Sequence, residues 1–150
     1  MSEFNYCSSL VKYQRIKTRE VNIGGVPLGS SQPIRIQSMT TTDTMNTIDT
    51  INQSIRMIKA GSEYVRITAP SINEAKNLKN IKDGLNQKGF TTPLIADIHF
   101  TPNAAEIAAQ IVPKVRINPG NYADKKKFKK FENTDKEYNN ELDRVYNKFS

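Results

Sequence analysis

The chain has 150 residues, a formal net charge of +7 that is spread along its length, and one cysteine, Cys7. A single cysteine excludes an internal disulfide and cannot hold a metal cluster alone, and the dispersed charge argues against a nucleic-acid partner. No apolar run approaches the roughly 20 residues of a membrane span, and the N-terminus lacks the features of a secretory signal, so we expect a cytoplasmic protein without a membrane partner.

The first part of the chain predicts an arm and a hairpin. Residues 1–18 are polar, with scattered tyrosines and basic residues, and predict an N-terminal arm. Residues 19–29 carry the pair Gly24-Gly25 between two short stretches in which apolar residues alternate. Paired glycines in this setting are typical of a tight β-hairpin. We expect the hairpin to precede the first strand of a barrel and to cover the floor of that barrel.

Four short strands are predicted next, and each of the first three is followed by a helical pattern. The first helix ends at Gly61, the second begins with a capping box of Ser71 and Glu74, and the third begins at Thr101 with Pro102 in its first turn. The expected strands lie at 33–39, 63–68, 93–100 and 114–118. The residues expected to be buried are Ile48, Ile51, Ile55 and Ile58 in the first helix, Ala75, Leu78, Ile81 and Leu85 in the second, and Ala104, Ala105, Ile107, Ala108 and Ile111 in the third.

This alternation predicts an α/β fold with a parallel sheet and right-handed crossovers. A complete TIM (β/α)8 barrel needs roughly 250 residues. We therefore expect residues 19–123 to form the N-terminal portion of such a barrel, about four strand–helix units with a leading hairpin. Residues 124–150 form a lysine-rich stretch and an amphipathic helix with a capping box of Thr134 and Glu137. We interpret this tail as the start of further sequence that the chain does not contain.

Polar residues alternate with apolar ones along all four expected strands. Strands of a parallel barrel are covered on both faces and are normally almost continuously apolar, so this alternation is unusual. Successive side chains point to opposite faces, which sends the apolar residues towards the helices and the polar ones into the barrel. The polar residues cluster towards the C-terminal ends of the strands, where barrel active sites lie. They are Gln37, Arg66, Thr68, Asp97, His99, Arg116 and Asn118.

The two arginines of this set, Arg66 and Arg116, favour an anionic ligand, because the guanidinium fork matches phosphate oxygens. A buried salt-bridge network around Asp97 is the alternative. Charge counting favours the anion, since Arg35, Arg66 and Arg116 face Asp97 alone on the inward side. For His99 we expect a binding role rather than a catalytic one. Asp97 and His99 resemble half of a metal site, but the chain has no second histidine, and we predict no metal here.

Several blocks of the sequence also resemble a known family. They are Gln37-Ser-Met-Thr40, Asp43-Thr44, Tyr64-Val-Arg-Ile-Thr68, Ala96-Asp-Ile-His-Phe100 and Arg116-Ile-Asn-Pro-Gly-Asn121. In their order and spacing they are similar to the signature blocks of 4-hydroxy-3-methylbut-2-enyl diphosphate synthase, a flavodoxin- or ferredoxin-dependent enzyme family. The tail at 124–150 is similar to the long form of that family.

The resemblance implies a TIM barrel and a separate domain that holds a [4Fe–4S] cluster through three cysteines and one glutamate. It also implies a homodimer, in which the cluster of one subunit closes over the barrel of the other. The implied reaction is the reductive ring opening of 2-C-methyl-D-erythritol 2,4-cyclodiphosphate to 4-hydroxy-3-methylbut-2-enyl diphosphate in non-mevalonate isoprenoid biosynthesis, with electrons from ferredoxin or flavodoxin. The residues implied to bind the substrate are Gln37, Ser38, Arg66, Asp97, His99, Arg116 and Asn118. Without the cluster ligands, this chain alone is expected to be inactive.

Two other functions stay open at this point. A transferase barrel of the dihydropteroate synthase type also binds a diphosphate substrate, although the blocks at 96–100 and 116–121 disfavour it. A non-catalytic fragment or basic binding module is compatible with a chain that lacks a cluster-binding set of cysteines.

Overall fold

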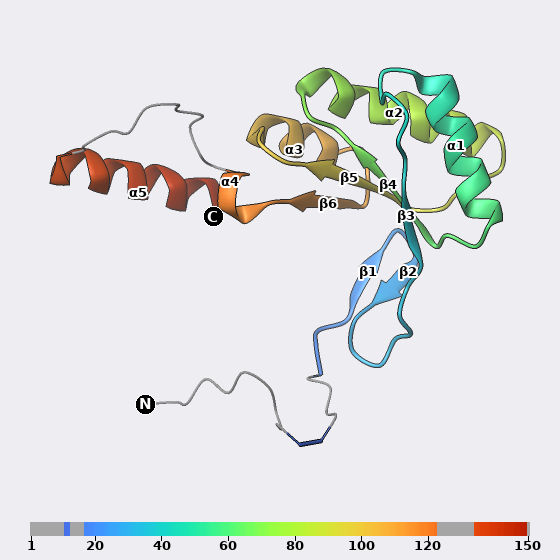
Figure 1. Ribbon diagram of the computed structural model, residues 1–150, viewed down its shortest axis with the longest axis horizontal. Coiled ribbons are helices and arrows are strands. Elements are labelled where there is room, and N and C mark those ends of the chain that lie inside the picture. The colour runs from blue at the N-terminus through green and yellow to red at the C-terminus, as the bar shows by residue number, and fades with distance from the viewer. Residues whose placement is uncertain (1–10, 13–16, 123–133, 150) are drawn as a thin grey trace.

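The computed structural model describes residues 11–12, 17–122 and 134–149, and its elements follow one another as strand–helix units (Figure 1). The predicted arm at 1–18 lies almost entirely outside the described residues. The elements are β1 (Val21–Ile23), β2 (Val26–Leu28), β3 (Gln37–Met39), α1 (Thr47–Lys59), β4 (Tyr64–Thr68), α2 (Ile72–Gln87), β5 (Leu94–Ile98), α3 (Pro102–Ala109), β6 (Lys114–Ile117), α4 (Pro119–Tyr122) and α5 (Asp135–Phe149).

The main sheet has the order β3-β4-β5-β6, and every neighbouring pair is parallel. This is the arrangement that the strand–helix alternation predicted, so the partial-barrel prediction is confirmed. The helices α1, α2 and α3 lie on one side of the sheet and the β1–β2 hairpin on the other (Figure 1). We call the face turned away from the three helices the inner face, because it would line the interior of a closed barrel.

The hydrophobic core lies between the sheet and the three helices. Apolar residues of β4 and β5 with one parity, such as Val65, Ile67 and Ala96, are fully buried there. The predicted stripe of α2 is buried at all four positions, and that of α3 is buried at Ala104, Ala105 and Ala108. The predicted outward face of the strands therefore forms one continuous core with the helices, as expected for a barrel wall.

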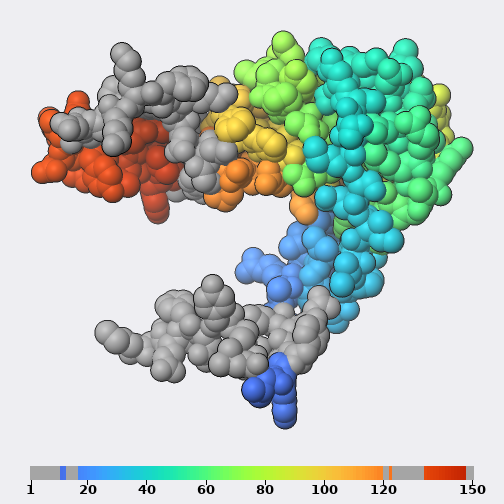
Figure 2. Space-filling model, in the orientation of Figure 1, coloured from blue at the N-terminus to red at the C-terminus, as the bar shows by residue number. Residues whose placement is uncertain are grey.

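The hairpin closes the lower end of the inner face, as the sequence predicted. Its strands pair antiparallel around the turn at Gly24-Gly25, where both glycines have positive φ values of 58° and 93°. It packs on the sheet through a second cluster, which we call the floor cluster: Ile23, Tyr64 and Ile95, with Val26 and Leu28 against them. The Tyr64 hydroxyl donates to the Val26 carbonyl at 2.9 Å. The hairpin, blue in Figure 2, projects from the sheet on the side opposite the helices.

Two predicted features of the first unit are wrong. Ile34 and Ile36 lie outside β3 and are 85% and 59% exposed, because α1 packs on β4 and α2 rather than over this part of the chain. Ile48 is 71% exposed. The first turn of α1 contacts α2 through Thr47, whose hydroxyl donates to the Asn77 side-chain oxygen at 3.2 Å. Because Thr47 faces α2, the next residue, Ile48, faces solvent.

The helix ends follow the sequence signals with one exception. Gly61 and Gly89 have positive φ values just beyond α1 and α2, and Ser71 accepts from the Asn73 N–H while its hydroxyl bonds the Glu74 carboxylate. Thr101 occupies the cap position of α3, but its hydroxyl donates to the Pro70 carbonyl instead of capping the helix.

The last described helix, α5, begins with the predicted capping box, in which the Thr134 N–H donates to Glu137 Oε2 at 2.9 Å. Its apolar residues Tyr138, Leu142 and Tyr146 are exposed by 57%, 50% and 73%. Among the residues that the structure describes, no helix combines the length and the apolar character needed to cross a bilayer. The domain boundaries at residues 18/19 and 123/124 stay predictions.

Candidate functional site

The strand register brings four of the predicted site residues together on the inner face. Asp97 of β5 is paired with Thr68 of β4 and with Arg116 of β6, and His99 follows β5 on the same face. Arg66 lies one row lower, and its long side chain reaches up to the level of Asp97. Arg66, Asp97, His99 and Arg116 form what we call the charged cluster. It lies at the C-terminal ends of the strands, where barrel active sites are built.

Asp97 is the centre of the charged cluster. Its carboxylate is 1% exposed and accepts from Arg66 Nη2 at 2.6 Å and from Arg116 Nη1 at 3.2 Å. His99 Nε2 lies 3.1 Å from the same oxygen that Arg66 contacts. Two arginines of separate strands therefore converge on one buried carboxylate.

The electrostatics of the cluster favour the ionised carboxylate. Burial raises the pKa of Asp97, but the hydrogen bond and charge of Arg66, together with His99, outweigh burial and leave this pKa below its usual value. The ionised Asp97 balances one guanidinium, so the two arginines and Asp97 together keep a net positive charge. Arg66 Nε is also buried and has no hydrogen-bond partner among the described residues. The cluster thus has spare positive charge and a buried donor that lacks an acceptor.

The structure does not bring Gln37 and Ser38 to the charged cluster. Gln37 is paired with Tyr64, a member of the floor cluster, and so lies at the opposite end of the inner face. Ser38 is paired with Val65 on the helix-covered face, where its hydroxyl oxygen accepts from Ser62 at 2.9 Å. Asn118 is half-buried and directly follows β6, two residues beyond Arg116.

The charge count that included Arg35 is corrected by the structure. Arg35 is paired with Glu63 at 2.7 Å, and its Nε donates to the Pro27 carbonyl at 2.9 Å. The N–H of Ile36 and the Arg35 guanidinium hold the pKa of Glu63 below its usual value. The expected strand at 63–68 gave Glu63 the parity of Val65, towards the helices, but β4 begins at Tyr64 and the Glu63 side chain bonds Arg35 instead. The excess of positive charge on the inner face is therefore carried by Arg66, Arg116 and Lys114, without Arg35.

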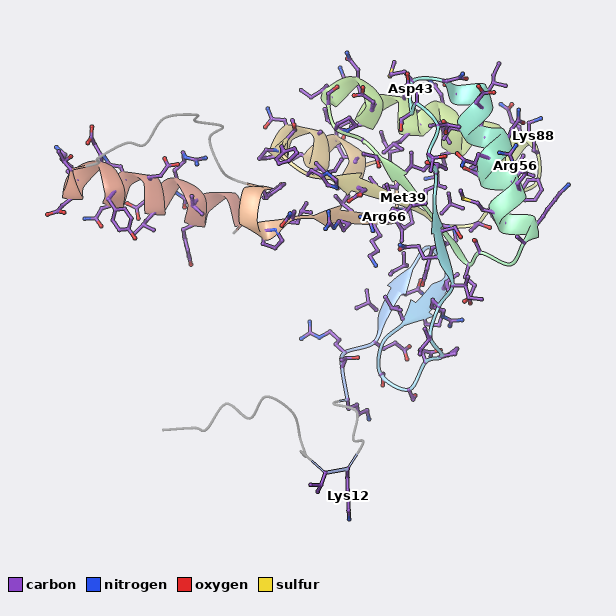
Figure 3. All side chains as sticks on the ribbon, viewed as in Figure 1. Lys12, Met39, Asp43, Arg56, Arg66 and Lys88 are labelled. Atoms are coloured by element: carbon purple, nitrogen blue, oxygen red, sulfur yellow. The ribbon has the colours of Figure 1, made fainter. Side chains whose placement is uncertain are left out.

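Met39 is an inner-face residue that the sequence reasoning did not select as a site residue. It is paired with Arg66 across β3 and β4, and the Thr40 N–H donates to the Arg66 carbonyl at 3.0 Å. Figure 3 shows Met39 and Arg66 next to each other at the sheet. The alternation of residues along the strand, which placed Arg66 on the inner face, also places Met39 there. An uncharged methionine did not stand out among the residues of that face.

The connection from β3 to α1 is held firmly at the rim of the sheet. Gln53 Oε1 accepts from the backbone N–H groups of Thr41 and Thr42 at 3.0 and 3.2 Å. The Thr44 hydroxyl donates to the Thr68 carbonyl, and Asn77 Nδ2 donates to the Thr44 carbonyl at 2.7 Å. These bonds fix the backbone beside the charged cluster. No sequence pattern singles out Gln53 and Asn77, because both lie within helices where polar residues normally face solvent.

No set of three or more histidine, cysteine, aspartate or glutamate residues is grouped for metal binding among the described residues. A pocket of about 400 Å³ lies at the other end of the sheet, away from the charged cluster, and is lined in part by Gly24, Lys82, Pro93 and Pro113. Pro93 and Pro113 precede β5 and β6, so this pocket opens at the N-terminal ends of the strands.

A parallel four-strand sheet with helices on one face, a hairpin under the other and a charged cluster at its C-terminal edge is characteristic of a TIM-type barrel wall. The chain belongs to the GcpE TIM-barrel domain family, whose model matches residues 18–145.

Curated relatives agree with this assignment. The chain is 52% identical over 141 residues to a 4-hydroxy-3-methylbut-2-en-1-yl diphosphate synthase (flavodoxin) of Bacteroides thetaiotaomicron, a match that covers 93% of the chain and 23% of the relative. It is 49% identical to the proteins of the same name from Leptospira interrogans, over 98% of the chain and 22% of the relative, and from Akkermansia muciniphila, over 97% and 25%. The chain thus spans a quarter or less of the length of these three relatives.

Proposed function

We propose that this chain supplies the diphosphate-binding part of the barrel of a 4-hydroxy-3-methylbut-2-en-1-yl diphosphate synthase. The substrate is 2-C-methyl-D-erythritol 2,4-cyclodiphosphate, which the complete enzyme opens reductively to 4-hydroxy-3-methylbut-2-enyl diphosphate for isoprenoid biosynthesis. One observation carries the proposal: Arg66 and Arg116 converge on Asp97 at the C-terminal ends of neighbouring strands. The match to relatives with this name supports it. The same match gives no support to the transferase alternative.

The charge balance of the cluster supports an anionic ligand over a purely structural ion-pair network. A structural pair would be complete with one arginine for one carboxylate, whereas here two guanidinium groups share Asp97. The side chains of Arg66 and Arg116 are 25% and 40% exposed, so both have donors near solvent while their positions are fixed by Asp97. A diphosphate would neutralise the remaining charge through charge-assisted hydrogen bonds.

Each member of the cluster has a role in this proposal. Arg66 and Arg116 bind the diphosphate oxygens, and the buried Asp97 carboxylate orients both guanidinium groups. His99, 39% exposed and held at Asp97, borders the ligand, as does Asn118 beyond Arg116. The family resemblance offered Gln37 and Ser38 as further contacts, but their positions on the sheet give them no support.

The [4Fe–4S] cluster of the proposed enzyme does not fit the residues of this chain. Cys7 is the only cysteine in the sequence, and the described residues hold no metal-binding group. The cluster would supply the electrons for ring opening, and its ligands must come from outside these 150 residues. We extend the proposal to flavodoxin, or alternatively ferredoxin, as the electron donor, and to a homodimer that brings a cluster over the barrel. This chain alone is then a substrate-binding unit without turnover.

Calorimetric titration of the chain with the cyclic diphosphate tests the proposal. Arg116→Ala removes a charge-assisted hydrogen bond, which contributes about 1.5–3 kcal/mol, so we expect an affinity lower by one to two powers of ten. Arg116→Lys should also bind more weakly, because it keeps the charge but loses the fork. Arg56→Ala is the matched control, since Arg56 is an exposed arginine on α1 in the helix layer (Figure 3). Unchanged affinity in both Arg66→Ala and Arg116→Ala would leave the structural network as the better account.

A further inference from the structure

Met39 occupies the one row of the inner face that joins the floor of the sheet to the charged cluster. That row runs Met39, Arg66, Ile95 and Lys114 across the four strands. Ile95 is 1% exposed in the floor cluster, whereas Met39 is 42% exposed and belongs to neither hydrophobic cluster of the described residues. Met39 is therefore the apolar side chain of this row that stays open to a ligand.

The backbone around Met39 is fixed relative to Arg66. The ladder bond from the Thr40 N–H to the Arg66 carbonyl sets the register, and Gln53 holds the next two N–H groups. Neighbouring strands lie about 4.8 Å apart, so an unbranched methionine next to Arg66 can contact a group bound by that arginine. A flexible thioether side chain suits the irregular surface of a small, branched ligand.

We propose that Met39 is a specificity-determining residue, whose side chain contacts the carbon skeleton of a ligand whose diphosphate is held by Arg66 and Arg116. The inference rests on the proposed function, and adds to it the part of the ligand that carries no charge. The proposed substrate has two chemically different parts, a diphosphate and a methyl-bearing carbon chain. The charged cluster serves only the first part. Met39 supplies the apolar contact for the second, and so distinguishes this substrate from other diphosphates.

Two ligands separate this role from a structural one. Inorganic pyrophosphate carries the diphosphate without the carbon skeleton, and 2-C-methyl-D-erythritol 2,4-cyclodiphosphate carries both. We expect Met39→Ser to weaken binding of the cyclodiphosphate about fourfold to fifteenfold, the range expected for losing one to two buried methylene-sized contacts. Pyrophosphate affinity should stay within about twofold. Met39→Leu, which conserves volume and apolar character, should bind both ligands almost as the unsubstituted chain does.

Met45 provides a matched control. It is 49% exposed, similar to Met39, but lies in the turn before α1, where its N–H bonds Asp43 Oδ1 at 2.9 Å. Met45→Ser should change neither affinity. The chain has four methionines, so methyl-labelled methionine gives a simple NMR spectrum in which each residue can be assigned by substitution. The cyclodiphosphate should produce magnetisation transfer between its own methyl group and the Met39 methyl, and none to Met45.

The outcomes are distinguishable. Unchanged cyclodiphosphate affinity in Met39→Ser would overturn the inference, as would an equal loss of affinity for both ligands, which would indicate a displaced Arg66. Both results leave the proposed function standing. If the unsubstituted chain binds neither ligand, the proposed function fails on this chain and the inference fails with it. The inference is supported if Met39→Ser loses affinity for the cyclodiphosphate but not for pyrophosphate, and Met39→Leu keeps both affinities.

Discussion

Replacement of Asp97 by asparagine removes the charge at the centre of the cluster with almost no change in shape. Asp97 is 1% exposed and accepts from Arg66 at 2.6 Å, so this bond should contribute close to the full value of about 1.5–3 kcal/mol. Arg116 is 40% exposed, and solvent screening reduces its contribution to about 1 kcal/mol or less. The new amide group adds a donor that faces guanidinium groups, which have no acceptor. We expect Asp97→Asn to lower the free energy of unfolding by about 2–4 kcal/mol.

Urea unfolding followed by circular dichroism measures this change through a shift of the midpoint at constant slope. Asp83→Asn is the matched control, because Asp83 is paired with Lys79 on the surface of α2, where the two side chains are 48% and 68% exposed. That pair should contribute less than about 0.5 kcal/mol. If Asp97→Asn costs no more than Asp83→Asn, the charged cluster does not hold the inner face together and the reasoning is refuted.

Three further predictions concern stability. Burial raises the pKa of Asp97, but Arg66 and His99 lower it more, so its stabilising effect is complete above the unfolded pKa of about 4 and is lost as pH falls through the lower folded value. The difference in unfolding free energy between the unsubstituted chain and Asp97→Asn should therefore shrink from pH 6 to pH 3 in urea titrations, and a constant difference would contradict this. Tyr64→Phe removes the bond to the Val26 carbonyl and should cost about 1 kcal/mol in the same assay, while an unchanged midpoint would show that the hairpin does not depend on it. A Cβ at Gly84 would overlap Ile51 Cδ1, so Gly84→Ala should be neutral or destabilising alone but stabilising by about 1 kcal/mol in an Ile51→Val background. Additive effects in that double-mutant cycle would argue against the contact.

The alternation of polar and apolar residues along the strands, together with the strand–helix order, predicted most of the fold and the position of the charged cluster. The alternation around Arg66, Asp97 and Arg116 placed all three on one face, and the strand–helix order placed that face at the mouth of a barrel. This worked because parallel strands in sequence order bring their C-terminal ends to one edge. It was enough to expect that consecutive strands are neighbours in the sheet, and the residue-by-residue pairing did not have to be known.

The resemblance and the strand pairing differ at two residues. The role of Gln37 and Ser38 as substrate contacts stays a prediction, but Ser38 shares the parity of Val65 and faces the helix side, and Gln37 lies at the floor end of the inner face. The partner of Arg35 was missed because Glu63 was expected inside the strand and facing the helices, whereas β4 begins one residue later and leaves Glu63 outside the alternation. Ile34 and Ile36 look buried in sequence, but burial depends on which helix covers a strand, and a periodic pattern in one segment does not contain that information.

The most direct test of the central claim is the activity of a chimera, in which this chain replaces the matching 141-residue segment of the Bacteroides thetaiotaomicron synthase. Consumption of the cyclic diphosphate is measured under anaerobic conditions with a chemical reductant, with Arg56→Ala as control and Arg66→Ala and Arg116→Ala as tests. We predict a chimera that turns over substrate, with kcat/KM unchanged by Arg56→Ala and reduced at least tenfold by each cluster variant. A folded, iron–sulfur-loaded chimera without activity, or one whose activity survives both cluster substitutions, would contradict the assignment of this chain as the diphosphate-binding part of the barrel.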